Sequence, residues 1–182
     1  MSSKASLLGP YISALCGIGQ RPGFETATAQ GYTRSCDRLE SDMTNPTAAI
    51  LVIGDEILSG RTRDSNLHFL AGELTRIGIT LGEARIVADS HPEIVAAVRA
   101  LSGKYTHVFT SGGIGPTHDD ITADAVAEAM GAKISHRADA MALLQAHYDR
   151  SGLPFNEARQ RMARIPDGAA LIDNPVSTAP GF

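Results

Sequence analysis

Thr110-Ser111-Gly112-Gly113-Ile114-Gly115-Pro116-Thr117-His118-Asp119-Asp120-Ile121-Thr122 is the stretch around which this chain is organised. It follows the apolar residues 107–109, a run typical of a strand. The three closely spaced glycines at 112, 113 and 115 allow a sharp turn and a close approach of the backbone to a ligand. The pattern predicts a strand, a glycine loop and then a helix, whose first N–H groups favour the binding of phosphate.

The two carboxylates after the glycines, Asp119 and Asp120, indicate more than a phosphate site. Adjacent like charges repel each other and repel phosphate, so a metal ion or an acid–base role would explain them. The alternative is that they only cap the helix expected over residues 123–130. The sequence alone leaves both interpretations open.

Composition is that of an ordinary globular domain: 182 residues, 43% hydrophobic and 20% charged. A formal charge of −4 and the lack of a basic run argue against nonspecific nucleic-acid binding and against an anionic membrane surface as partner. No apolar run approaches the roughly 18 residues that a membrane helix needs. Cys16 and Cys36 have no metal-ligand spacing, so we expect a soluble protein in a reducing compartment, the cytoplasm.

Residues 1–45 show no sustained hydrophobic period and are expected to be a disordered tail with few core contacts. Arg21, Arg34 and Arg38 would suit an organelle transit peptide, but acidic residues in the same segment argue against one. A start assigned too early, with Met43 as the true first residue, is the other alternative.

From residue 47 the chain alternates strands and helices. The continuous apolar run 48–53 predicts a parallel strand buried on both faces, which delivers Asp55 and Glu56 to its carboxyl end, where open α/β sheets bind ligands. The expected elements that follow are a helix capped by Asp64 or Ser65 and ended by Gly78, a half-buried strand over 81–88, a helix over 92–102 and a strand over 106–110. This order predicts an α/β fold with a mostly parallel sheet and helices on both faces.

Beyond Gly131 the pattern is looser. Helices are expected over 139–149 and 156–164, and a short strand or hairpin arm over 168–173.

Three separated motifs resemble one known family. They are residues 54–60 (Gly-Asp-Glu-Ile-Leu-Ser-Gly) with Asp64 and Asn66, residues 111–122, and residues 174–182 (Asn-Pro-Val-Ser-Thr-Ala-Pro-Gly-Phe). In this order they resemble the MoaB/Mog-type molybdopterin-binding domain, most closely the CinA N-terminal (competence/damage-inducible) branch, which also occurs fused in FAD synthases. The resemblance covers residues 47–182 and implies a three-layer α/β sandwich whose glycine loop holds phosphate.

The resemblance also implies an activity. Molybdopterin-adenylylating relatives carry an Arg-Asp pair after the loop, whereas this chain has Ile114 within it and His118-Asp119-Asp120 after it, the CinA-like form. That form implies divalent-metal-dependent cleavage of a nucleotide diphosphate such as ADP-ribose or FAD. Molybdopterin binding or adenylylation with MgATP, and a non-catalytic nucleotide-binding module, are the alternatives. Relatives continue past the position of Phe182, so the resemblance implies a domain truncated at its C-terminus and supports ligand binding more directly than turnover.

Site residues follow from the matched motifs. The candidate catalytic residues are Asp55, His118, Asp119 and Asp120, and the metal ligands for Mg, Mn or Co are Asp55, Asp119 and Asp120. The phosphate-binding residues are Ser111, Gly112, Gly113, Ile114, Gly115 and Thr117, and the further ligand-binding residues are Glu56, Asp64 and Asn66.

Purely structural roles are alternatives to some of these assignments. His118 could bind phosphate, relay a proton or be held in an ion pair with the carboxylates, and Asp64 could simply cap a helix. The expected partner is a small nucleotide or pterin, with neither nucleic acid nor membrane. A homo-oligomer is expected because relatives form dimers or trimers and because the apolar faces of the predicted helices leave apolar surface exposed.

Overall fold

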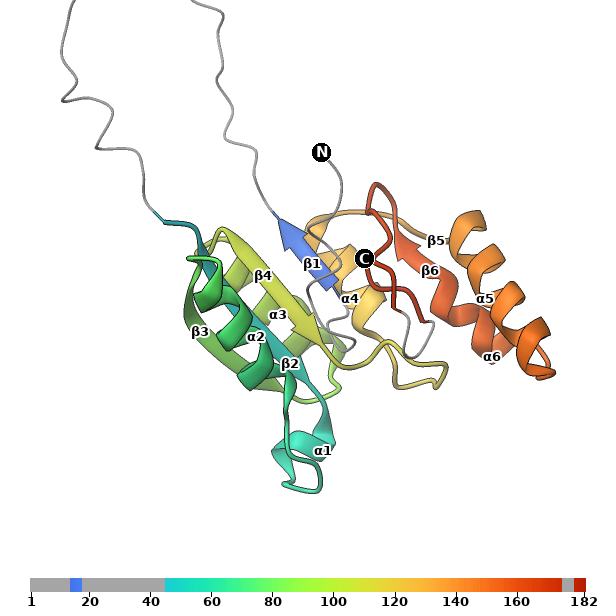
Figure 1. Ribbon diagram of the computed structural model, residues 1–182, viewed down its shortest axis with the longest axis horizontal. Helices are drawn as coiled ribbons and strands as arrows, with labels where there is room; N and C mark the ends of the chain where they lie inside the picture. The colour runs from blue at the N-terminus through green and yellow to red at the C-terminus, as the bar shows by residue number, and fades with distance from the viewer. Residues whose placement is uncertain (1–13, 18–44, 175–178) are drawn as a thin grey trace, which may run out of the picture.

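A four-stranded sheet forms the centre of the protein. The computed structural model describes residues 45–174 and 179–182, and the backbone of residues 14–17. The strands lie in the order β1 (Ala14–Gly17), β4 (His107–Ser111), β2 (Thr47–Ile53) and β3 (Thr80–Val87) (Figure 1). β2 runs parallel to both β3 and β4, and β1 runs antiparallel to β4. The predicted mostly parallel α/β sheet is confirmed, with the strands around Ile50 and Val108 as neighbours.

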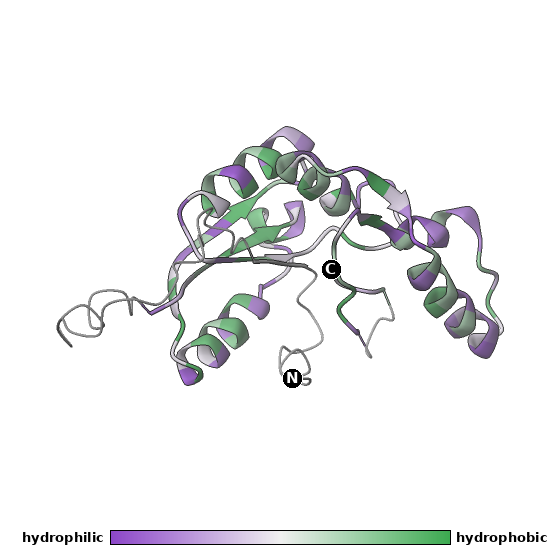
Figure 2. Cartoon of the chain, turned by 90° about the horizontal axis from the view of Figure 1, so that it is seen from above, coloured by the Kyte–Doolittle hydropathy of each residue, from purple (hydrophilic) through white to green (hydrophobic). Residues whose placement is uncertain are grey.

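The central strand β2 separates two hydrophobic cores. Residues 48–53 are at most 2% exposed, and successive side chains point to opposite faces of the sheet. Residues 48, 50 and 52 join a core with α2 (Asn66–Arg76), while residues 49, 51 and 53 join a larger core with α3 (His91–Ser102) and α4 (Thr122–Met130). Figure 2 shows the apolar strands between helices on both faces. The three-layer sandwich is therefore confirmed.

The helices of this part begin and end close to where the sequence predicts. At the start of α2 the Asp64 carboxylate accepts a hydrogen bond from the Leu67 N–H at 2.8 Å, and Gly78 follows the helix with a φ of 79°. One element is unpredicted: the residues directly after β2 form the single helical turn α1 (Asp55–Leu58). Asp55 and Glu56 still lie at the carboxyl end of β2, as expected.

β3 lies at the edge of the sheet, and its alternating exposure confirms the predicted half-buried strand. Its Glu83 accepts hydrogen bonds from Arg85 at 2.6 Å, Lys104 at 3.0 Å and the Tyr105 hydroxyl at 3.0 Å. These donors, Arg85 foremost, lower the pKa of Glu83 to about 2. Gly82 makes room for the Tyr105 ring, because a Cβ there would lie 2.7 Å from a ring carbon. The cluster ties the edge strand to the turn before β4.

The C-terminal part departs from prediction in two places. Helix α5 (Ala138–Ser151) matches the expected one, but the helix expected over 156–164 is wrong beyond residue 160. There the chain forms α6 (Glu157–Gln160), the 3₁₀ turn η3 (Arg161–Ala163) and then β6 (Arg164–Pro166), which pairs with the unpredicted β5 (Ile134–His136). Burial of Met162, Ala163 and Ile165 against the main core outweighs the local helical preference.

The hairpin arm expected over 168–173 is reduced to one bridge. Only Ile172 pairs, with Gly181, through two backbone hydrogen bonds of 2.8 and 3.0 Å. This bridge brings the last residues of the chain back to the core, where Ala179 and Phe182 are buried.

The N-terminal segment differs from expectation at four residues. Ala14–Gly17 form β1 and extend the sheet beside β4, so this piece of the predicted tail is structured. The remainder of the prediction concerns residues 1–13 and 18–44, which lie outside the described residues. In the described ranges, no helix combines the length and apolar character needed to cross a bilayer.

We predict that replacing the fully buried Leu51 by Ala lowers the free energy of unfolding by about 2–5 kcal/mol, because it leaves a cavity in the larger core. Leu58→Ala is the matched control, since this leucine is 56% exposed, and its effect should stay within about 0.5 kcal/mol. Chemical denaturation measures both. Equal losses would contradict the placement of the core.

The Glu83 cluster predicts a pH dependence. Its carboxyl pKa is about 2 in the folded chain against 4.5 ordinarily, so its stabilising effect is complete above pH 4.5 and is lost as the pH falls through about 2. The stability difference between wild type and Glu83→Gln should therefore shrink over that window. Denaturation curves at a series of pH values measure it, and added salt should reduce the difference because water and ions screen this surface cluster. A difference independent of pH would refute the assignment.

Candidate functional site

The glycine loop leaves β4 by crossing the end of β2. A Cβ on Gly112 would lie 2.0 Å from the Ile53 carbonyl oxygen, far inside any real contact, and the residue has a φ of 105°. Only glycine therefore allows the two strand ends to meet in this way. The crossing places the loop at the carboxyl ends of adjacent parallel strands, the position where such sheets bind ligands.

Thr122 pins the loop to the first turn of α4. Its hydroxyl donates to the Gly112 carbonyl at 2.9 Å, and its N–H donates to the Gly113 carbonyl at 3.1 Å. A Cβ on Gly113, which has a φ of 63°, would lie 2.3 Å from the Thr122 hydroxyl oxygen. The fully buried Thr122 thus fixes the backbone of both glycines.

The helix-cap alternative for Asp119 and Asp120 is wrong. Helix α4 begins at Thr122, so the flanking residue is Ile121, and no side chain caps this end. The two carboxylates consequently do something else, and they do different things.

Asp120 shapes the loop from within. Its carboxylate accepts hydrogen bonds from the Thr117 N–H at 2.8 Å and from the Thr117 hydroxyl. It also packs against Gly115, where a Cβ would lie 2.7 Å from its Oδ2. Asp120 therefore holds the turn between Gly115 and Thr117, a role suited to positioning the backbone rather than to binding a metal.

Asp119 belongs instead to a group of carboxylates at the strand ends. Asp55 and Asp89 exchange hydrogen bonds: the Asp55 N–H donates to Asp89 at 2.9 Å, and the Asp89 N–H donates to Asp55 at 3.4 Å. Burial, followed by the charges of Glu56, Asp55 and Asp119, raises the pKa of Asp89, although the Asp55 N–H opposes this. The predicted residues Asp55, Glu56 and Asp119 are thus brought into one electrostatic field.

Asp119 itself stays charged. The Thr117 hydroxyl is the largest cause that lowers the pKa of Asp119, and the charge of His118 contributes in the same direction. The ion-pair, phosphate-binding and proton-relay roles considered for His118 all stay predictions.

The three predicted metal ligands are not gathered around one point. Within the described part of the chain, no group of three His, Cys, Asp or Glu side chains is placed to hold a metal ion. The donor chemistry does suit a hard divalent cation, because carboxylate oxygens are its preferred ligands. Burial is the largest cause of the raised pKa of Asp89, and the charges of Glu56, Asp55 and Asp119 add to it. The metal assignment stays a prediction, with Asp89 better placed than Asp120 as the third carboxylate.

The remaining predicted residues divide between site and scaffold. Asn66 donates from its side-chain amide to the Ser111 hydroxyl at 2.5 Å, so it lies directly beside the glycine loop. Asp64 caps α2, which is the structural role considered for it as an alternative. Glu56 folds back over Gly54, where its carboxylate would contact a Cβ.

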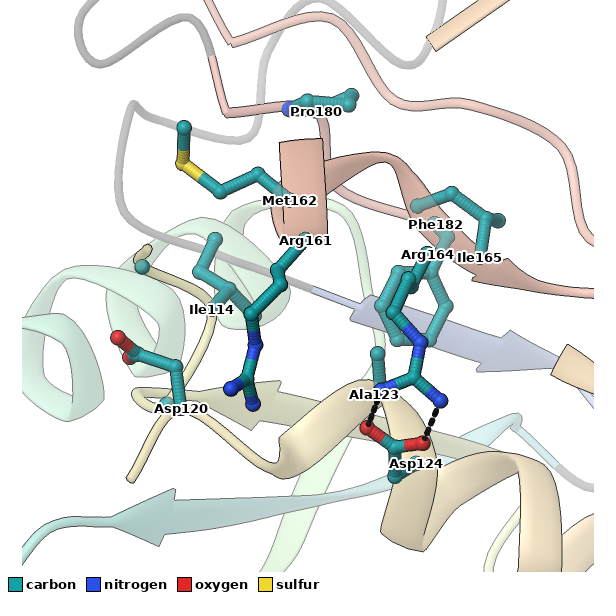
Figure 3. A pocket seen from close by; sticks show the side chains of 12 residues that line it. Ile114, Asp120, Ala123, Asp124, Arg161, Met162, Arg164, Ile165, Pro180 and Phe182 are labelled. Atoms are coloured by element: carbon teal, nitrogen blue, oxygen red, sulfur yellow. Dashed lines mark hydrogen bonds and ion pairs between the residues drawn. The ribbon is translucent and has the colours of Figure 1, made fainter. Parts of the chain in front are cut away.

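An open pocket lies on the other side of the loop, and the space that it encloses, together with the open solvent at its mouth, is about 370 Å³ (Figure 3). Gly113, Ile114, Gly115 and Asp120 form one wall, and residues of η3 and β6, together with Pro180 and Phe182, form the opposite wall. At the base, Arg164 holds Asp124 of α4 through two hydrogen bonds of 2.6 and 3.0 Å.

Sequence reasoning missed three residues of this region. Asp89 follows β3 just as Asp55 follows β2, so the shared strand-end position was a usable signal. Thr122 stands within the quoted motif, but nothing in the motif shows its buried hydroxyl. Arg161 reaches the pocket from η3. The continuous helix predicted over 156–164 gave no indication that this side chain would line a pocket.

Comparisons with known proteins agree with this geometry. Residues 49–182 match the family model described as "probable molybdopterin binding domain". A protein of Metallosphaera sedula is 38% identical over 137 residues, and one of Pyrobaculum calidifontis is 40% identical over 137 residues. Both alignments cover 75% of this chain and 52% of the relative, so the chain spans about half the length of the curated relatives that it matches.

A solved structure, that of the protein CinA with unknown function from Thermoplasma acidophilum, is similar with a TM-score of 0.69 and 34% sequence identity. The match covers 75% of this chain and 79% of that one. The family model spans most of β2, all of β3 and β4, the glycine loop and the C-terminal Ala-Pro-Gly-Phe segment. This chain therefore belongs to the family of probable molybdopterin binding domains and is similar to CinA.

Proposed function

We propose that this protein binds a phosphate-bearing nucleotide or pterin at the glycine loop and, with Mg, Mn or Co, hydrolyses a nucleotide diphosphate of the ADP-ribose or FAD type. The observation that carries the proposal is the glycine loop itself. A Cβ on Gly112 would collide with the Ile53 backbone, and one on Gly113 with the fully buried Thr122, so the bare backbone is closely packed next to an open pocket. Such a rigid backbone turn before a helix suits an anion.

The two sides of the glycine loop suit two different groups, a phosphate and a divalent cation. Phosphate is repelled by the carboxylates of Asp55, Asp89 and Asp119, so it belongs on the pocket side. A divalent cation is attracted by the same three carboxylates, and when bound it would offset phosphate charge and lower the pKa of an attacking water. The chain's own contribution is positioning, because the loop fixes the phosphate at the boundary between the two sides.

A second candidate function rests on the family match. Binding or adenylylation of molybdopterin, with MgATP as adenylyl donor, would use the same phosphate site. A binding module without turnover is the third reading, since no three acidic or histidine side chains within the described ranges are gathered around a metal. We also propose that the protein self-associates, since the exposed side chains of Leu58, Phe69 and Ile77 offer apolar surface for a second copy. The proposed location is the cytoplasm.

The first test compares substrates. Incubation with ADP-ribose, with FAD, and with ATP plus molybdopterin, each with Mg, Mn or Co, should release AMP from ADP-ribose or FAD in a cation-dependent reaction followed by chromatography. Asp119→Asn should reduce this turnover by roughly tenfold or more, at least the cost of losing an outer partner of a metal. Its cation-free ligand affinity should persist or rise, because the repulsion of phosphate is reduced.

Each contrary outcome has a meaning. Adenylylated molybdopterin as the sole product would favour the second function, and binding without any product would favour the module. Wild-type turnover in Asp119→Asn would remove this carboxylate from the reaction. Asp120→Asn is the comparison variant: an effect without cation as well as with it is expected, because Asp120 holds the loop through Thr117.

The second test isolates the close packing of the loop. Gly113 and Gly131 have nearly equal φ values of 63° and 67°, so alanine meets a similar backbone penalty of about 1–2 kcal/mol at both. A Cβ at 113 collides with Thr122, whereas a Cβ at 131 meets nothing within 4 Å. Gly113→Ala should therefore abolish or strongly weaken binding of ADP-ribose in calorimetry, while Gly131→Ala retains it. Equal affinities in the two variants would argue against the loop as the phosphate site.

A further inference from the structure

We infer that Arg161 is the cationic residue that receives the ligand's phosphate opposite the glycine loop, and that the ligand places one phosphate, carried by a nucleoside or a similar flat ring, in this pocket. This inference rests on the proposed function, because it names a further residue and a ligand class for the same site. Arg161 stands at the start of η3 and lines the pocket. Figure 3 shows its side chain reaching from η3 across the pocket towards the side of Asp120 and the glycine loop.

The charge of Arg161 is uncompensated in the described part of the chain. Its guanidinium makes no hydrogen bond or ion pair there, whereas the nearby Arg164 is held by both oxygens of Asp124. Asp120, the other carboxylate of the pocket, is engaged by the N–H and hydroxyl of Thr117. A partly buried arginine without a partner stabilises an incoming anion more than a paired one, since no internal salt bridge must first be broken.

The wall opposite Arg161 complements that charge. Gly113 and Gly115 present backbone without side chains, and the N-terminal end of α4 lies beside them with no capping side chain. The N–H groups of Ala123 and Asp124, which also line the pocket, have no acceptor among the described residues. An anion between this wall and Arg161 would meet donors from both directions, and a guanidinium offers two parallel donors to a phosphate.

The rest of the lining indicates the chemistry of the ligand. Ile114, Met162 and Pro180 give the pocket an apolar side, which suits a ring rather than a second phosphate. Asp120 leaves one negative charge at the loop, which would repel a further phosphate in the same space. A single phosphate attached to a flat organic group fits both features better than inorganic diphosphate does.

The test uses AMP, inorganic phosphate and adenosine as probes in calorimetric titrations of the whole chain. Wild type should bind AMP more tightly than either fragment. Arg161→Gln should weaken AMP binding by about tenfold to a hundredfold, the usual range for a lost charged hydrogen bond. Arg161→Lys should fall between the two, because it keeps the charge and loses the fork, and adenosine binding should be the same in all three.

Arg150→Gln is the matched control, since it removes the same charge from an exposed arginine at the end of α5, outside the pocket lining. It should leave AMP affinity unchanged. The melting temperature of Arg161→Gln should equal that of wild type, because no described contact is lost. Added salt should weaken AMP binding by wild type more steeply than by Arg161→Gln.

The outcomes distinguish a failure of this inference from a failure of the proposed function on which it rests. Equal AMP affinity in wild type and Arg161→Gln, with loss in Gly113→Ala, would overturn the role of Arg161 and leave the glycine-loop site standing. Tighter binding of inorganic diphosphate than of AMP would overturn the ligand class. Failure of wild type to bind AMP, ADP-ribose or FAD would overturn the proposed function itself.

Discussion

The contact between Gly112 and the Ile53 carbonyl is the constraint on which the site depends. Because no Cβ stands between them, the chain leaving β4 can cross directly over the end of β2. This crossing sets the height of the glycine loop above the sheet and delivers the chain to α4 through Thr122. β6 is joined to that helix by the ion pair between Arg164 and Asp124.

The crossing also divides two chemically different surfaces. On one side the ends of β2 and β3 carry Asp55 and Asp89, linked by mutual backbone-to-side-chain hydrogen bonds. On the other side lies a pocket with arginine and apolar side chains. Two adjacent residues in the sequence, Asp119 and Asp120, differ in their surroundings: the charge of Asp119 acts on Asp89, whereas Asp120 lines the pocket.

The sequence predicted the sheet and its main helices because these elements follow local rules. The apolar run 48–53 has one stable location, the middle of the sheet, and glycines 78 and 112 mark turns that only glycine makes easily. It failed at residues 161–166, where burial of Met162 and Ile165 in a core formed by distant segments overrides helical spacing. It also failed to separate Asp119 from Asp120, because neighbours in sequence carry no signal of diverging contacts. Arg161 was missed for the same reason as β6: both depend on a chain reversal set by tertiary packing.

The ion pair between Arg164 and Asp124 has one more consequence. The two walls of the pocket come from segments about forty residues apart, one attached to the sheet and the other to the small β5–β6 ribbon, and this pair joins them at the base. Two opposed charges thus join the walls directly, in addition to the apolar core that α4 shares with η3 and β6. A ligand that brings its own negative charge into the pocket would be attracted by one member of this pair and repelled by the other.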